Sequence, residues 1–164
     1  MTCVNGRRWR HFWKNTKRGE KAMTKEEFFA AFGEPYLQTP GGQGVFLAGI
    51  ALGMLARGQA KEIDASPVFK QLPFGRLRQR DVKRQLARLP ELAKAYDVKY
   101  KEIIRKTAVW AGDALLQGDG SELGVEGNFS FATAFMNASA YFWTLHGKKQ
   151  EEAAESAAEQ GVQA

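Results

Sequence analysis

The chain has 164 residues, of which 44% are hydrophobic and 26% are charged, so it is long enough for one domain with a buried core and does not have the composition of a disordered protein. Its formal net charge of +6 favours anionic partners such as nucleic acid or an acidic protein surface. The single cysteine, Cys3, excludes an internal disulfide and fits a reduced, cytoplasmic setting. The first residues carry positive charge without a following apolar run, so no secretory signal is predicted.

Residues 1–23 are predicted to form a basic arm. Its rings Trp9, Phe12 and Trp13 have the spacing of one face of a helical turn. Basic side chains interleaved with aromatic rings can hold a nucleic-acid backbone while the rings stack on bases. The alternative is that the rings dock on the core and the charges are solvated. The cations of the arm that we predict to contact nucleic acid are Arg7, Arg8, Arg10 and Lys14.

A short helix is predicted over residues 24–32, because Thr24 and Glu27 have the spacing of a capping box. The glycine-rich segment 40–44 follows and leads into the next helix. It lacks the Lys-Ser/Thr ending of a P-loop and a preceding strand, so it is not predicted to bind a nucleotide.

The central element is a helix predicted over residues 45–59, which is apolar on nearly every side for three turns and is therefore buried. Its apolar run of about a dozen residues is shorter than the roughly 17–25 that a membrane span needs. Gly49 and Gly53 lie four positions apart and are expected to let neighbouring helices approach closely. The alternative is that they only weaken the helix, at about 1 kcal/mol each relative to alanine.

Two further helices are predicted, one after the cap Ser66 and one from residue 77 to 96 that Pro90 should kink or split. The second helix has an apolar side and a side with a row of cations at four-residue steps. Such a row repels itself, whereas guanidinium groups match phosphate oxygens well. A nucleic-acid surface is therefore predicted, with a solvated face or a protein contact as the alternative. The predicted contacts are Arg76, Arg78, Arg80, Lys83, Arg84 and Arg88.

The next helix is predicted over residues 98–116, with Lys101 and Arg105 near its start as additional phosphate contacts. A glycine-rich, acidic loop is predicted over residues 112–127, and its spacing does not match a calcium-binding loop. A last helix, capped by Asn128 or Ser130, is predicted to end at His146.

Together these elements predict an all-α fold, a compact bundle of about five or six helices. One domain over residues 1–147 is expected, followed by a polar, acidic and flexible tail over 148–164. Only two histidines and one cysteine are present, too few for a converging metal site or a Cys-His nucleophile. No enzyme activity, metal or cofactor is predicted.

The order of three segments carries a family resemblance. The segments are GVFLAGIALGMLARGQ with its terminal Gln59, then ASPVFKQL, then LRQRDVKRQLARLPELAKAY, and the later NFSFATAFMNASAY closes the pattern. The chain resembles the C-terminal helical part of the large subunit of type I-B CRISPR Cascade complexes, over roughly residues 28–145. In such systems this part can also be made separately from an internal start as the small subunit, and a chain of this length that begins with Met looks like that product.

The resemblance implies a non-catalytic small subunit present in several copies. Its implied partners are the Cascade backbone and large subunits, neighbouring copies of itself, and the guide RNA and target DNA, with no membrane. Basic faces would steady the guide–target duplex and the displaced strand, and a recruited helicase-nuclease would cut the DNA. Two other functions stay open: a purely scaffolding helical subunit and an independent basic DNA-binding regulator.

Overall fold

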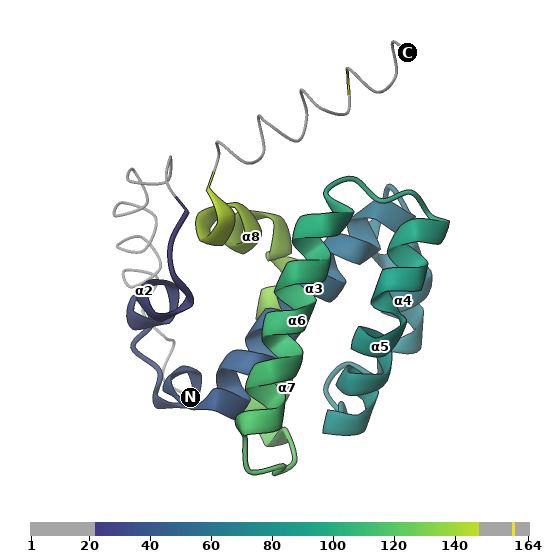
Figure 1. Ribbon diagram of the computed structural model, residues 1–164. Helices are drawn as coiled ribbons and strands as arrows, with labels where there is room; N and C mark the ends of the chain where they lie inside the picture. The colour runs from purple at the N-terminus through teal and green to yellow at the C-terminus, as the bar shows by residue number, and fades with distance from the viewer. Residues whose placement is uncertain (1–21, 148–158, 160–164) are drawn as a thin grey trace. The chain divides into compact units, whose positions relative to one another are not determined.

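A computed structural model describes residues 22–147 and residue 159 of the chain (Figure 1). Internal contacts divide the chain into two compact units. The larger unit consists of residues 33–142, and the other combines residues 1–32 with residues 143–164.

The predicted all-α fold class is confirmed. Residues 22–147 form α-helices and two 3-10 segments, without a strand. Five of the α-helices are seven residues or longer, in agreement with the predicted bundle of about five or six helices. No helix in this part of the chain has the length and apolar character needed to cross a bilayer. The predicted division into a domain over 1–147, an arm over 1–23 and a tail over 148–164 stays a prediction.

The central helix of the larger unit is α3 (Pro40–Gln59), and its residues from Val45 to Ala56 are all buried. It begins earlier than the predicted residue 45, because the Thr39 hydroxyl accepts a hydrogen bond from the Gly42 N–H at 3.1 Å and Pro40 occupies the first helical position. The elements that contact α3 are η2 (Pro35–Gln38), η3 (Ile63–Ala65), α4 (Pro67–Gln71), α5 (Gln79–Ala95), α6 (Lys101–Gln117) and α7 (Gly124–Met136) (Figure 1).

The predicted close approach at the two glycines of α3 is confirmed. A Cβ atom on Gly49 would lie 2.7 Å from the Cβ of Ala134, and one on Gly53 would lie 2.5 Å from the backbone oxygen of Phe135. Real Cβ atoms do not come this close to other heavy atoms. The backbone of α3 therefore packs directly against α7, and a larger residue at either glycine would push the two helices apart.

Pro90 does not split α5, so that part of the prediction is wrong. The helix is continuous from Gln79 to Ala95 with Pro90 inside it. Pro90 is exposed, so its ring does not disturb the buried side of the helix. Proline removes only one backbone hydrogen bond of the helix, and the strong helix formers around Pro90 keep the helix continuous.

The last predicted helix is instead two helices, α7 and α8 (Ala138–His146), with Asn137 between them. The predicted loop over 112–127 is also wrong in extent, since α6 runs to Gln117 and α7 begins at Gly124. Gly127 is buried, and a Cβ there would lie 2.6 Å from the Cβ of Leu123. This glycine therefore allows close packing inside a helix and is not the loop residue that the sequence predicts.

Arg57 of α3 ties down the C-terminal end of α7. Its guanidinium donates hydrogen bonds to the carbonyl oxygens of Gly53 at 3.0 Å, Phe135 at 3.1 Å and Met136 at 2.8 Å. The last carbonyls of a helix lack partners within the helix, and a cation there also complements the helix dipole. Burial lowers the pKa of the Arg57 guanidinium from its ordinary value.

The smaller unit contains α2 (Lys25–Ala30) and the end of α8. The predicted capping box is confirmed, because the Thr24 hydroxyl accepts from the Glu27 N–H at 3.2 Å and the Glu27 carboxylate accepts from the Thr24 N–H at 3.3 Å. The rings of Phe28 and Phe29 are buried and meet edge to face at 5.1 Å. The Ser66 cap of α4 in the larger unit is likewise confirmed, with the Phe69 N–H donating to the Ser66 hydroxyl at 3.3 Å.

Candidate nucleic-acid interface

Helix α5 is strongly amphipathic. One side of the helix belongs to the core, because its buried side chains recur at steps of three or four residues: Val82, Gln85, Leu89 and Ala93. The start of the helix is secured by Asp81, whose carboxylate accepts a hydrogen bond from the Arg78 N–H at 2.9 Å. The rest of the helix surface is available for charge.

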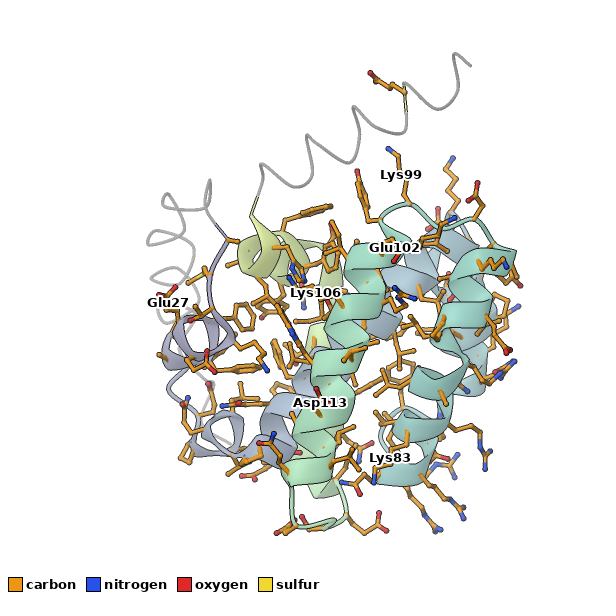
Figure 2. The ribbon with its side chains drawn as sticks, in the orientation of Figure 1. Glu27, Lys83, Lys99, Glu102, Lys106 and Asp113 are labelled. Atoms are coloured by element: carbon orange, nitrogen blue, oxygen red, sulfur yellow. The ribbon has the colours of Figure 1, made fainter. Side chains whose placement is uncertain are left out.

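The predicted row of cations lies on that outer surface. At about 3.6 residues per turn, Arg80 and Arg84 fall opposite the buried side, with Lys83 and Arg88 flanking them. All four side chains are exposed, and Figure 2 shows Lys83 among nitrogen-tipped side chains that project from α5. Within the described part of the chain, no ion pair involves any of these four residues. Their charges therefore remain available to an anionic partner.

One member of the row is oriented by a neighbouring helix. The Arg88 guanidinium donates to the Gln71 side-chain oxygen at 2.7 Å, and that oxygen also accepts from the Gln85 amide at 3.3 Å. A guanidinium has five N–H donors, so this contact leaves most of them available. Gln71 thus positions Arg88 without neutralising it.

Arg76 and Arg78 precede α5 and are held in place through the residue between them. The Leu77 N–H donates to the Asn128 side-chain oxygen at 2.7 Å, and the Asn128 amide donates to the Leu77 carbonyl at 3.3 Å. Asn128 is not the helix cap that its position in the sequence predicts: it lies inside α7 and its side chain holds a distant backbone segment. No local sequence signal could have shown this pairing, since it depends on the tertiary packing of α7.

The two predicted contacts on α6 have acidic neighbours. The Lys101 ammonium lies 3.1 Å from the Asp97 carboxylate, and the Arg105 guanidinium lies 3.0 Å from the Glu102 carboxylate. These carboxylates stand four and three positions earlier in the chain, so the sequence spacing alone could have indicated the pairs. Exposed ion pairs of this kind contribute about 0–1 kcal/mol, and a phosphate could displace them. Nucleic-acid contact by Lys101 and Arg105 stays a prediction.

The remaining predicted contacts, Arg7, Arg8, Arg10 and Lys14, lie outside the described residues. Nucleic-acid contact by this arm also stays a prediction. The structure therefore describes the part of the predicted surface that lies on α5 and just before it, together with Lys101 and Arg105 of α6.

A cleft of about 520 Å³ lies at the N-terminal end of α3, over the glycine-rich segment. Helix N-termini favour anions, but the carboxylates of Asp119, Glu122 and Glu126 line this cleft and disfavour a phosphate. Burial, and next the charge of Glu126, raise the pKa of the Tyr36 phenol in the same cleft above 10.0. That the glycine-rich segment binds no nucleotide stays a prediction.

Among residues 22–147, no three His, Cys, Asp or Glu side chains are grouped so that they could hold a metal ion. In the described part of the chain, the cationic surface of α5 is therefore the candidate functional site.

Comparison with known proteins gives one family match. The model of the CRISPR-associated protein TM1802 (cas_TM1802) C-terminal domain matches residues 10–149. Neither a curated protein nor a solved structure gives a significant match. The match covers most of the chain and includes every helix described above, so the predicted CRISPR association is confirmed. The chain belongs to the family of the CRISPR-associated protein TM1802 C-terminal domain.

Proposed function

We propose that this chain is a non-catalytic small subunit of a type I-B CRISPR Cascade complex, present in several copies in the cytoplasm. In this role it binds the nucleic-acid backbone and stabilises both the guide RNA–target DNA duplex and the displaced non-target strand. Its protein partners are the backbone and large subunits of the complex and neighbouring copies of itself. Membership of a CRISPR-associated family supports the setting, and the charged surface of α5 supports the nucleic-acid role.

The single observation that carries the proposal is the exposed row of α5 cations without carboxylate partners in the described part of the chain. Arg80 and Arg84 lie one helical turn apart on a rigid helix, about 6 Å along its axis, so each can meet a different phosphate. Phosphate contacts fix the position of a nucleic acid without reading its sequence. A subunit that must accept any target needs this kind of contact.

Several weak copies can act together. When neighbouring copies lie on one strand, each additional contact becomes intramolecular, and the combined affinity exceeds that of any single copy. Weak binding by the isolated chain is therefore expected. Cleavage of the target DNA would belong to a separate, recruited helicase-nuclease.

The experiment is fluorescence anisotropy with labelled single-stranded DNA, duplex DNA and RNA, each in several unrelated sequences, over a series of salt concentrations. The proposal predicts weak, sequence-independent binding that declines linearly in a plot of log affinity against log salt. Failure to bind any of the three at low salt would reject the nucleic-acid role and favour the scaffolding subunit. A preference for one duplex sequence would favour the DNA-binding regulator instead.

A further inference from the structure

One face of α7 is apolar and exposed. Val125, Phe129 and Met136 expose 88%, 69% and 49% of their surface, and the half-buried Ala132 lies between the last two. These four residues, which we call the α7 stripe, recur at three- to four-residue steps and so share one side of the helix. The opposite side of α7, with Phe131 and Phe135, belongs to the core. Exposed apolar stripes of this kind typically mark protein contacts.

The charges at the two ends of α7 differ in sign. Glu126 lies in its first turn, and Glu122 precedes the helix. At the other end, the Arg57 guanidinium donates to the carbonyls of Phe135 and Met136 and still has unused N–H donors. An antiparallel copy of α7 would bring the acidic end of one helix to the Arg57 end of the other. The dipoles of the two helices would then point in opposite directions, which is favourable.

We propose that the α7 stripe is the contact surface for a second copy of this chain, with the two α7 helices antiparallel about a two-fold axis. In the register that centres the stripe, Val125 faces Met136 of the second copy and Phe129 faces Ala132 of the second copy. Each large side chain then meets the space beside a smaller or more flexible one, as knobs-into-holes packing requires. In the same register Glu126 lies near the end of the second copy's α7, where Arg57 is held.

This contact rests on the proposed function in one respect, because it names the surface by which the neighbouring copies of that proposal would meet. It does not rest on the nucleic-acid role, because the stripe and the α5 cations are on different helices. A variant that separates the copies is expected to keep the weak binding of the single chain to nucleic acid. Conversely, a variant of the α5 row is expected to keep the dimer. The two ideas can therefore fail separately.

The first test measures the mass of the purified full chain over a range of concentrations by analytical ultracentrifugation. The proposal expects a concentration-dependent dimer that Phe129→Glu abolishes. Leu116→Glu is the matched control, because Leu116 is also an exposed apolar residue, on α6 outside the stripe. A wild-type chain that stays monomeric at all concentrations, or a dimer that Phe129→Glu leaves intact, would overturn the proposal. Circular dichroism checks that both variants keep the fold.

The second test fixes the direction of the two helices by cross-linking. In a Cys3→Ser background, single variants Val125→Cys and Met136→Cys are oxidised separately and as an equal mixture. In the antiparallel register the two positions meet between copies, whereas like positions lie about 16 Å apart along the helix. A disulfide-linked dimer in the mixture alone supports the proposal. Cross-linking of Val125→Cys with itself, or none in the mixture, would refute the antiparallel contact.

Discussion

The side-chain amide of Asn128 pairs with both backbone polar groups of Leu77, accepting from the N–H at 2.7 Å and donating to the carbonyl at 3.3 Å. Leu77 is buried, so these backbone groups have no ready access to water. The contact therefore fixes the path of the chain between Arg76 and Arg78, where the proposed phosphate-binding surface begins.

Replacing Asn128 tests the value of this clamp. Asn128→Ala leaves the Leu77 N–H unsatisfied, so we expect a loss of about 1–3 kcal/mol in the free energy of unfolding. Asn128→Asp retains an acceptor but loses the donor, and we expect a smaller loss. Urea denaturation followed by circular dichroism measures both. Equal stability of Asn128→Ala and the wild type would show that the clamp contributes nothing.

The glycines of α3 provide a second prediction. Alanine has the higher helix propensity, yet Gly53→Ala would place a Cβ 2.5 Å from the Phe135 backbone oxygen. We expect Gly53→Ala to destabilise the protein by about 1–3 kcal/mol, as overpacked cores do. Gly112→Ala on α6 is the matched control, because no heavy atom lies within 4 Å of the added Cβ. It should raise stability by up to about 1 kcal/mol.

The matched pair is read by the midpoint of urea unfolding. Opposite shifts support the account of close backbone packing. A gain of stability in Gly53→Ala would mean that α3 and α7 can separate without loss, and that these glycines only weaken the helix.

Arg57 provides a third prediction. Its guanidinium donates to three carbonyl oxygens, among them those of Phe135 and Met136 at the end of α7. A lysine ammonium cannot reproduce the planar fork that reaches several acceptors, so the substitution is not conservative here. We expect Arg57→Lys to lower the free energy of unfolding by about 1–3 kcal/mol. Hydrogen exchange at the α7–α8 junction should rise in the same variant, and unchanged exchange would contradict the proposed role.

The phenol of Tyr141 predicts how stability depends on alkaline pH. Burial, and next the charge of Glu34, raise its pKa above the ordinary value of 10.0. Below pH 10 the phenol is neutral in both the folded and the unfolded chain, so its contribution to stability is complete. As the pH rises above 10 the unfolded chain loses this proton first, and the free energy of unfolding falls.

The measurement is urea unfolding at several pH values from 8 upward. We expect the decline above pH 10 to be shallower in Tyr141→Phe, which has no phenolic proton to lose. Tyr96→Phe is the control, since it makes the same substitution at an exposed tyrosine. Identical slopes in wild type and Tyr141→Phe would contradict the assignment.

Sequence periodicity predicted most of the helices, but it predicted their first and last residues poorly. The apolar run around Gly49 and Gly53 predicted the buried helix and its close packing, because both follow from local composition. The prediction of a loop over 112–127 was wrong because glycine is typical of loops, while Gly127 is buried in α7, where an added Cβ would lie 2.9 Å from the hydroxyl oxygen of Tyr36. Tertiary contact decides between these two uses of glycine, and a single sequence does not contain that contact.

The charged surface shows the same limit. The spacing of Arg80, Arg84 and Arg88 predicted one exposed row, because a regular helix fixes which residues share a side. The roles of Asn128 and Arg57 depend on segments far away in the chain, so local patterns did not reveal them. The exposed stripe of α7 was missed for a related reason, since its first residue, Val125, fell in the predicted loop.

The central claim is that the α5 row binds phosphates, and the salt dependence of binding tests it most directly. The double variant Arg80→Gln/Arg84→Gln is compared with Lys61→Gln/Lys70→Gln, which removes the same charge from exposed positions outside the predicted surface. If both α5 arginines contact phosphates of duplex DNA, the slope of log affinity against log salt should decrease in magnitude by about 2 in the first variant. The second variant should keep the wild-type slope. Equal slopes in all three proteins would contradict the claim, because the α5 cations would then act only through their contribution to net charge.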